Sequence, residues 1–445
     1  MQKIDTLIHA KWVLPMAPSQ RILNQHSIAI DEGKIIACLP TSESHQLFDA
    51  TNVVTKDQHI LMPGLINNHT HSPMNLLRGL ADDLPLMQWL NHHIWPAENK
   101  VMNPDVVELG STLAIAEMIR GGTTCFNDNY AFPLNTRNAA IHAGIRASLG
   151  LLIFNVECQW SNNEKEGLDK AKTILTEHNQ SHPLISWTLA PHSPYTVNDA
   201  AFLQLKELAE QYQLPIHLHL HETLAEIEMS HEHHHMRPIQ RLAQLGLIDQ
   251  DLIAVHMVHL TPQEIDLLAE KQSHIVLCPE SNLKLGSGIA PIKSIIDGGI
   301  NVSLGTDGAA SNNDLDVFSE MRTSALLCKG AAQDPTTLPA HEVLAMATIN
   351  AAKALKLDHK IGSIEPGKQA DIIAIDTSEY WQQPVYNPIS HLVYAANPLA
   401  VSDSWVAGTP LMKNKTLTTI DTTALSSQIA PLIEQIRPFM YQDKK

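Results

Sequence analysis

The sequence has little of what marks secreted, membrane or nucleic-acid-binding proteins. Its five cysteines are scattered along the chain and form no CxxC pair. An odd, widely spaced set of this kind is typical of reduced thiols and not of a disulfide framework. No apolar run approaches the roughly 18 residues that a membrane helix needs, and residues 1–5 lack the basic-then-apolar pattern of a secretion signal. We therefore expect a cytoplasmic protein.

Basic residues are also scarce. The chain has 30 Lys and Arg against 47 Asp and Glu, which gives a formal net charge of −17. Such a chain repels phosphate backbones and anionic lipid surfaces. We expect neither a nucleic-acid partner nor a membrane surface. Histidine, in contrast, is abundant, with 25 residues, and this raises the expectation of a metal site.

The middle of the chain alternates apolar, β-rich runs with longer helical patterns. Such alternation predicts βα units and a parallel sheet, and eight units suggest a closed barrel. The expected fold class is therefore α/β, a (β/α)8 TIM-like barrel. The eight runs cover residues 61–68, 123–128, 146–154, 185–193, 215–222, 252–259, 274–281 and 302–307.

The two flanks show a different pattern, of short alternating strands separated by turn residues. Since both flanks lie outside the barrel pattern, we expect residues 1–58 and 362–420 to pair as one small β-sandwich domain. Residues 59–361 would then form the catalytic barrel, and residues 421–445 a C-terminal helix.

The first run ends in His69-Thr70-His71. On a strand, residues i and i+2 point to the same face, so both imidazoles can converge on one ion. Barrel active sites lie at the C-terminal ends of the strands, which is where this pair falls. A bare HxH motif is nevertheless more often two surface histidines on a loop.

The fifth run ends in HLHLHE, residues 217–222. His217, His219 and His221 share one parity, so periodicity does not choose a metal ligand among them. Glu222 could take a proton from bound water and pass it on, although a lone glutamate at such a position is more often a solvated loop acid.

The sixth and eighth runs end near His256 and Asp307. His259 is the alternative to His256 as the site residue of the sixth run. Asp307 alone could equally be a helix N-cap. Together, however, the polar residues that end runs one, five, six and eight share one mouth of the expected barrel. Nitrogen and oxygen ligands without thiolate suit zinc, with iron or manganese as alternatives. We therefore predict one site for a divalent metal.

Ordered motifs along nearly the whole chain resemble the amidohydrolase superfamily and, within it, the methylthioadenosine/S-adenosylhomocysteine deaminases. The matching segments are MPGLINNHTH (62–71), LLRG (76–79), GGTT (121–124), APHSPY (190–195), HLHET (219–223), SNLKLGSG (281–288), LGTDGAASNN (304–313) and IEPGKQAD (364–371).

This resemblance implies a metal-dependent deamination of adenine nucleosides that releases ammonia. 5′-Methylthioadenosine is the first expected substrate, followed by S-adenosylhomocysteine or adenosine. The resemblance also implies roles for six residues. The metal ligands would be His69, His71, His219 and Asp307. Glu222 would shuttle protons between water and the ring, while His256 and Asp307 would orient and deprotonate the water.

The resemblance extends to the residues that would bind the nucleoside. The implied contacts are Glu98 to the ribose hydroxyls, Trp89 and Trp95 on the same segment, His192 facing the nucleoside, Ser311 near the base and Arg146 at the substrate tail. A packed helix face would also explain Trp89, and a strand-start surface charge would explain Arg146. A second family arginine has no counterpart in residues 158–167, which favours methylthioadenosine over S-adenosylhomocysteine.

Three alternatives remain to be weighed. Another amidohydrolase, such as a guanine or cytosine deaminase or a triazine chlorohydrolase, is the nearest. A zinc-binding structural barrel without turnover is disfavoured by Glu222, since a structural site is closed and needs no proton shuttle. The zinc deaminases with a PCxxC signature are excluded because the chain has no such motif. Homo-oligomerisation stays open.

Overall fold

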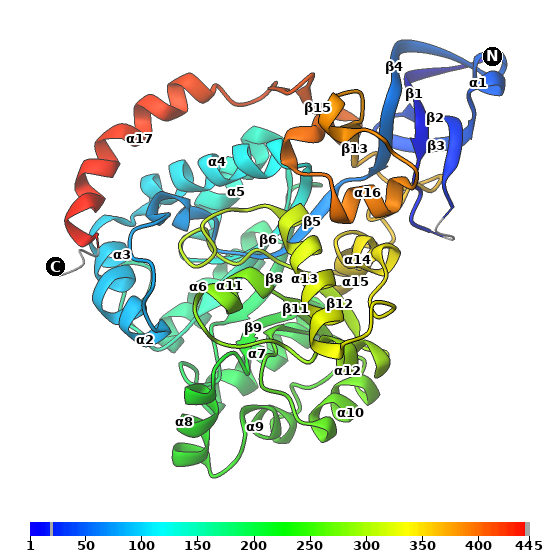
Figure 1. Cartoon of the computed structure of the whole chain (residues 1–445). Helices are drawn as coiled ribbons and strands as arrows, with labels where there is room; N and C mark the ends of the chain where they lie inside the picture. The colour runs from blue at the N-terminus through cyan, green and yellow to red at the C-terminus, as the bar shows by residue number, and fades with distance from the viewer. Residues whose placement is uncertain (18–20, 441–445) are drawn as a thin grey trace.

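The computed structural model describes residues 1–17 and 21–440 and contains two eight-stranded sheets. One of them is a barrel of parallel strands in consecutive order, with helices around it (Figure 1). This confirms the predicted (β/α)8 barrel. Its strands are β5 (Leu65–Thr70), β6 (Thr123–Tyr130), β7 (Arg146–Ile153), β8 (Ile185–Pro191), β9 (Ile216–Leu220), β10 (Leu252–His256), β11 (His274–Leu277) and β12 (Asn301–Leu304).

The barrel closes between β12 and β5, where few backbone bonds join the first and last strands. The backbone N–H of Asp307 donates to the carbonyl of His69 over 3.0 Å, and the Asn68 amide donates to the Ser303 hydroxyl over 2.8 Å. Gly305 lies at this seam, and a Cβ there would stand 2.6 Å from the Cβ of His69. Only glycine allows the two strands to approach so closely.

Helices cover the outside of the barrel, and side-chain caps define where several of them begin. The Asn103 side chain accepts from two backbone N–H groups of α4, and the Asn198 side chain accepts from one backbone N–H of α7, that of Ala201. The main helices are α4 (Pro104–Arg120), α5 (Pro133–Ala143), α6 (Glu164–His178), α7 (Asp199–Tyr212), α8 (Leu224–His234), α9 (Pro238–Gln244), α10 (Pro262–Glu270), α11 (Pro279–Lys284), α12 (Ile292–Asp297), α13 (Val317–Ala332), α14 (Ala340–Met346), α15 (Ile349–Ala354) and α16 (Pro388–Tyr394).

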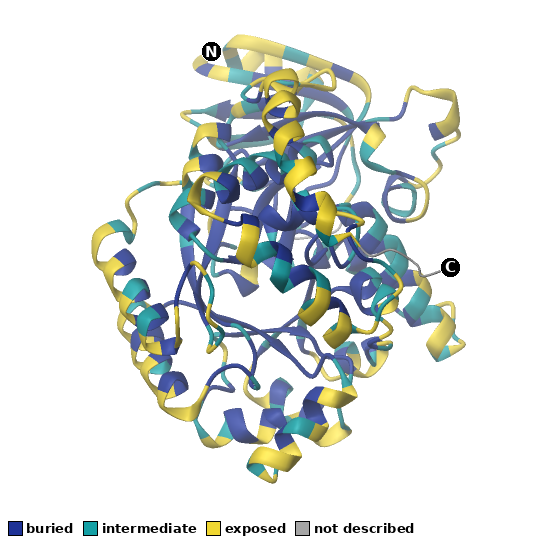
Figure 2. Cartoon of the chain, turned by 90° about the vertical axis from the view of Figure 1, so that its left-hand side faces the viewer, coloured by how far each residue is buried: buried dark blue, intermediate teal, exposed yellow. Residues whose placement is uncertain are grey.

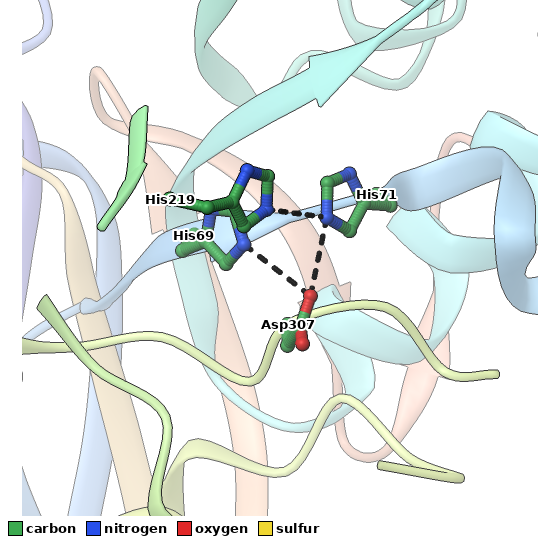
Figure 3. Close-up of side chains that lie close together, drawn as sticks. All are labelled: His69, His71, His219 and Asp307. Atoms are coloured by element: carbon green, nitrogen blue, oxygen red, sulfur yellow. Dashed lines mark hydrogen bonds and ion pairs between the residues drawn. The ribbon is translucent and has the colours of Figure 1, made fainter. Parts of the chain in front are cut away.

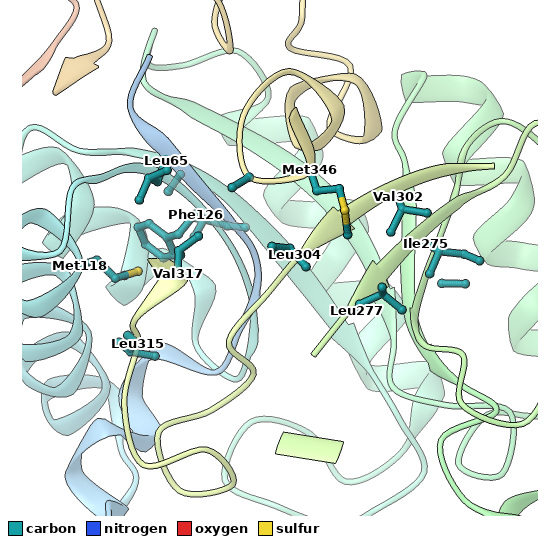
Figure 4. Close-up of a cluster of buried hydrophobic side chains, with 14 of the residues drawn as sticks. Leu65, Met118, Phe126, Ile275, Leu277, Val302, Leu304, Leu315, Val317 and Met346 are labelled. Carbon is teal, nitrogen blue, oxygen red and sulfur yellow. The ribbon is translucent and has the colours of Figure 1, made fainter. Parts of the chain in front are cut away.

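The main hydrophobic core lies between the strands and these helices. Phe126 of β6 and Leu304 of β12 belong to it together with Met118 of α4, and all three are fully buried (Figure 4). Buried residues follow the strands and the inner helix faces, while exposed residues lie on the outer faces (Figure 2). The packed shell holds the strand ends, and hence the residues that follow them, in fixed positions.

The second sheet is built from both flanks of the chain, as expected from the sequence. Its order is β16-β15-β14-β13-β4-β1-β2-β3, and β1 pairs in parallel with β4. Residue 58, the expected end of the first flank, lies within β4, which continues to Pro63 and is followed by β5. The strands are β1 (Gln2–Val13), β2 (Leu23–Asp31), β3 (Lys34–Pro40), β4 (Phe48–Pro63), β13 (Ile372–Asp376), β14 (Val401–Val406), β15 (Thr409–Lys413) and β16 (Thr416–Leu417), with helix α1 (Thr41–Leu47) between β3 and β4.

A segment of short helices between β5 and α4 forms one wall of the barrel mouth. It consists of η1 (Ser72–Leu77), α2 (Leu86–Trp89), η2 (Leu90–Ile94) and α3 (Trp95–Val101). The last helix, α17 (Thr422–Ile436), packs on α3, α4 and η1 (Figure 1). Its Ile436 joins a buried cluster with Trp89 and Ile94. Residues 441–445 of the expected C-terminal helix lie outside the described residues.

Within the described ranges, no helix is both long and apolar enough to cross a membrane.

Candidate functional site

Three histidines and one aspartate meet at the C-terminal mouth of the barrel. His69 and His71 come from the end of β5, His219 from β9, and Asp307 from the loop after β12. One potential ligand atom of each residue lies within 4.8 Å of the others. Nε2 of His69 and Nε2 of His71 are 3.3 and 3.2 Å from Oδ1 of Asp307 (Figure 3). The structure thus brings together the four residues that the sequence suggested as metal ligands.

The outer nitrogens of two of these histidines are fixed by backbone carbonyls. Nδ1 of His71 donates to the carbonyl of Asn129 over 2.6 Å, and Nδ1 of His219 donates to the carbonyl of His192 over 2.7 Å. In a neutral imidazole the second nitrogen then carries a lone pair, so both Nε2 atoms are prepared to bind a cation.

The third imidazole, that of His69, is arranged through another histidine. Its Nδ1 lies 3.0 Å from Nε2 of His217, and its own Nε2 is buried without a hydrogen-bond partner. An orphaned buried nitrogen facing a carboxylate and two prepared imidazoles fits a divalent cation.

The geometry also separates the three histidines of the fifth run. His221 follows the end of β9 with a φ of 55°, so it no longer follows the alternation of the strand, and its Nδ1 lies 3.1 Å from the carbonyl of His259.

Asp307 has an unusual backbone for a non-glycine residue, with a φ of 62°. Its Oδ2 accepts from the hydroxyls of Ser281, over 2.6 Å, and Ser311, over 2.9 Å. Burial alone would raise the pKa of this carboxyl group, but His69 and His71 hold the pKa well below its ordinary value. The left-handed conformation aims an ionised carboxylate at the cluster, and backbone strain of this kind gathers at functional sites.

Glu222 and His256 face each other beside the cluster. Oε2 of Glu222 lies 3.8 Å from Nε2 of His256, whose Nδ1 is 2.9 Å from Oδ1 of Asn282. The Ser287 hydroxyl donates to Oε1 of Glu222 over 3.2 Å, and burial raises the pKa of this carboxyl group. His259, the competitor of His256, instead donates to the carbonyl of Ser287 over 2.9 Å. A buried carboxyl group beside the metal-ligand cluster is suited to hold and release a proton during a reaction there.

A deep pocket opens above these residues. Its wall includes the metal-ligand candidates His71, His219 and Asp307, as well as Glu222, His256 and five of the expected substrate residues: Trp89, Trp95, Glu98, His192 and Ser311. The Tyr130 hydroxyl donates to Oε1 of Glu98. Burial raises the pKa of Glu98 to about 7 and lowers that of His192 to about 3. His192 is therefore neutral and can hydrogen-bond to a base without adding charge.

Arg146 does not lie in this pocket, and its expected contact with the substrate tail is wrong. The residue begins β7, at the end of the barrel opposite to the mouth. Its guanidinium forms a two-point ion pair with Asp371, at 2.8 and 3.1 Å, and its Nη1 donates to the carbonyl of Pro183. Both charged side chains are buried. Nothing in the sequence pointed to this partner, because Asp371 comes 225 positions after Arg146.

The sequence analysis assigned no role to four further polar residues. Ser281, Asn282 and Ser287 orient Asp307, His256 and Glu222, respectively, and Tyr130 holds Glu98. The first three belong to the motif SNLKLGSG, which follows β11 at the same mouth. A polar motif after a buried strand was the signal that could have revealed them.

The family to which this arrangement belongs follows from comparison with known proteins. The model of the amidohydrolase family matches residues 60–411. The chain belongs to the amidohydrolase family. This confirms the resemblance drawn from the motifs, and it places the chain in a metal-dependent superfamily of hydrolases.

Relatives within the amidohydrolase family match almost the full length of the chain. A protein named 5-methylthioadenosine/S-adenosylhomocysteine deaminase from Teredinibacter turnerae is 43% identical over 97% of this chain and 98% of its own. The crystal structure of an adenosine deaminase from Xanthomonas campestris with bound zinc has a TM-score of 0.96 and 45% identity, over 98% and 99% of the two chains. An atrazine chlorohydrolase from Arthrobacter aurescens, 24% identical with a TM-score of 0.88 over 96% of this chain and 100% of its own, shares the fold.

Proposed function

We propose that this amidohydrolase deaminates adenine nucleosides hydrolytically, with 5′-methylthioadenosine as its substrate and ammonia as a product. The observation that carries this proposal is the position of Glu222, a buried carboxyl group with a raised pKa that lies between the metal-ligand cluster and a pocket lined by aromatic residues. The relatives named methylthioadenosine/S-adenosylhomocysteine deaminases support the same chemistry.

The proposed cofactor is one divalent metal, held by His69, His71, His219 and Asp307. Zinc is the first candidate because three imidazoles and one carboxylate match its ligand preference and because the related adenosine deaminase was crystallised with zinc. Such a metal would supply Lewis acidity that lowers the pKa of bound water to about 7.

The residues of the chain would then direct the protons. Asp307 and His256 accept hydrogen bonds from the attacking water and fix its orientation toward the carbon that bears the amino group. Glu222 would take a proton from that water and deliver it to the adjacent ring nitrogen while the hydroxyl adds to the ring carbon. The remaining proton of that hydroxyl would then pass to the amino group, so that the C–N bond breaks, ammonia leaves and the ring carbon becomes a carbonyl. Since Oε2 of Glu222 lies 3.8 Å from Nε2 of His256, both side chains can contact the same reacting water.

The nucleoside would be held by groups further up the pocket. Glu98 accepts hydrogen bonds from the ribose hydroxyls, the neutral imidazole of His192 pairs with the base, and the hydroxyl of Ser311 lies near the ring. Trp89 and Trp95 supply apolar surface on the wall formed by α2 and α3. These contacts favour a purine nucleoside over a free base.

The test is a substrate series assayed by ammonia release and by the ultraviolet shift from adenine to hypoxanthine. Methylthioadenosine is expected to have the highest kcat/KM among adenine nucleosides, guanine, cytosine and a chlorotriazine. Turnover of guanine or cytosine without turnover of adenine nucleosides would overturn the proposal.

A matched pair of variants tests Glu222 itself. Glu222→Gln is expected to keep its metal and to lose kcat by at least ~10²-fold, the scale of a general acid–base group. The control is Glu270→Gln, an exposed residue of α10 whose substitution should leave kcat unchanged. Wild-type activity in Glu222→Gln would remove this residue from the mechanism.

A further inference from the structure

A second buried glutamate, Glu226, contacts the chain at Glu222 and has no role in the chemistry above. It lies on the first turn of α8 and is 3% exposed. Its Oε1 accepts from the backbone N–H of His221 over 2.9 Å, and its Oε2 accepts from the backbone N–H of Glu222 over 2.8 Å. One carboxyl group therefore binds two consecutive N–H groups of the segment that carries the proposed proton shuttle.

The turn that these two bonds hold has an unusual backbone. Strand β9 ends at Leu220, and the next residue, His221, has a φ of 55°, in the left-handed region that non-glycine residues rarely adopt. The carbonyl of His221 accepts from the backbone N–H groups of Val258 and His259, over 3.0 and 3.1 Å, and its N–H is held by Glu226. Since such a conformation persists only where the surroundings enforce it, the carboxyl group of Glu226 helps to set the direction in which the chain leaves the strand.

Capping of helix α8 explains only part of this arrangement. The N-cap residue is Thr223, whose hydroxyl accepts from the N–H of Glu226 over 3.2 Å. In a capping box, the carboxylate at the third helical position returns to the N–H of the N-cap residue. The carboxylate of Glu226 reaches further back, to Glu222 and His221. Its contacts therefore belong to the strand end as much as to the helix.

The two N–H bonds require an acceptor at each oxygen of Glu226. An ionised carboxylate accepts at both oxygens, whereas glutamine has the same shape but accepts at only one. Burial raises the pKa of the Glu226 carboxyl group, and the N–H groups of His221 and Glu222 act against this rise in favour of the ionised form. In Glu226→Gln, the side-chain amide would turn its own N–H groups toward one of the two backbone N–H donors. This substitution therefore disturbs the turn without leaving a cavity.

We propose that Glu226 is a positioning residue for the proton shuttle: its carboxylate holds the turn at His221 and so places the carboxyl group of Glu222 beside His256. The Ser287 hydroxyl and His256 contact the end of the Glu222 side chain, while Glu226 binds its backbone. Proton transfer needs heavy atoms about 2.6–3.2 Å apart, so a backbone shift of about 1 Å is enough to interrupt it. This inference rests on the proposed deamination, in which Glu222 moves the protons.

The first test compares Glu226→Gln with a matched control, Glu166→Gln. Glu166 has the same position in α6, where its Oε2 accepts from the backbone N–H of Asn162, the residue before the N-cap Asn163, but its side chain is 36% exposed. Glu226→Gln is expected to lower kcat for methylthioadenosine by about tenfold or more, with KM and metal content close to those of the wild type. Glu166→Gln should change none of the three.

The outcomes separate this inference from the proposed function. Wild-type kcat in Glu226→Gln would overturn the inference and leave the deaminase proposal intact. A loss of metal in proportion to the loss of kcat would also overturn it, because Glu226 would then support the metal site and not the shuttle. Failure of the wild-type enzyme to deaminate any adenine nucleoside would instead overturn the proposed function.

A double-mutant cycle tests whether Glu226 acts through Glu222. If it does, Glu226→Gln has no further effect once the shuttle is gone, so kcat of the double variant should lie within about twofold of kcat of Glu222→Gln alone. A role in the stability of α8 alone would lower kcat by the same factor in both backgrounds, and such additive losses would refute the inference. Glu226→Asp, which keeps the charge on a shorter side chain, is expected to retain more kcat than Glu226→Gln, and the reverse order would count against a role for the carboxylate.

Discussion

Arg146 offers a sharp prediction, because the structure replaces a substrate contact with a structural one. Its side chain is 3% exposed and that of Asp371 is 2% exposed, and two hydrogen bonds join them between the barrel and the second sheet. We consider three variants: Arg146→Met, Asp371→Leu and the double substitution. If the ion pair is structural, all of them should change stability and none should specifically change nucleoside affinity.

The magnitudes follow from what each variant leaves buried. Arg146→Met leaves the carboxylate of Asp371 with the backbone N–H of Ala407, at 2.8 Å, as a remaining donor. Removing one partner of a buried pair costs about 3–5 kcal/mol. In the double variant no charge remains, but the N–H of Ala407 and the carbonyl of Pro183 lose their partners. Apolar replacement of both charges is often nearly neutral, and an unsatisfied buried group costs about 1–3 kcal/mol. Because only the single variants leave an unpaired buried charge, the double variant should lose less stability than the sum of the losses in the two single variants.

The assay is equilibrium unfolding in urea, followed by circular dichroism, together with KM for methylthioadenosine. The control is Arg437→Met, which breaks the ion pair between Arg437 and Glu434. Because these two side chains are 62% and 68% exposed, respectively, this substitution should leave the unfolding midpoint unchanged. The reasoning is refuted if Arg146→Met unfolds at the wild-type midpoint, or if it raises KM while stability is unchanged. The latter result would return Arg146 to the substrate.

Three further predictions concern the site. Because the carboxylate of Glu98 is needed to accept ribose hydrogen bonds and burial raises its pKa to about 7, KM for adenine nucleosides should rise as the pH drops below about 7. Glu98→Gln should lose this dependence of KM on pH, and an unchanged KM profile would contradict this. His219→Ala should contain less metal than the wild type by mass spectrometry of the purified protein, and equal content would exclude His219 as a ligand. Gly305→Ala brings a Cβ to within 2.7 Å of the backbone nitrogen of His69 and should lower both Tm and metal content, whereas Gly330→Ala, with open space around it, should lower neither.

The sequence was most informative where chemistry and topology coincide. Histidines and an aspartate after runs one, five, six and eight could be assigned to one mouth, because the C-terminal ends of parallel strands in a barrel lie together. Periodicity could not choose among His217, His219 and His221, since all three share one parity. Two features of the structure leave His219 as the metal-ligand candidate. Strand β9 ends at Leu220, before His221, and the ring of His217 contacts Nδ1 of His69. Both are properties of the assembled barrel.

Two features were beyond what local patterns could predict. Strand β4 (Phe48–Pro63) is largely exposed over its first half, so its sequence shows no apolar run until Ile60, and the predicted first run joined its end to β5. The partner of Arg146 is Asp371, which lies in the opposite flank of the chain. Pairings of this kind are set by the fold as a whole, because a local sequence window contains only one of the two residues.

Helix α17 links the far end of the chain to the wall of the pocket. Its Ile436 packs with Trp89 and Ile94, and the carbonyl of Phe439 accepts from Nδ1 of His93 on the same wall. A tag, a truncation or a substitution in this helix would thus act on the nucleoside through the short helices that α17 supports, although no atom of the helix lines the pocket. When versions of the enzyme differ in their final residues, differences in their kinetic constants would reflect changes in the packing of α2 and α3 as well as changes in the chemistry at the metal.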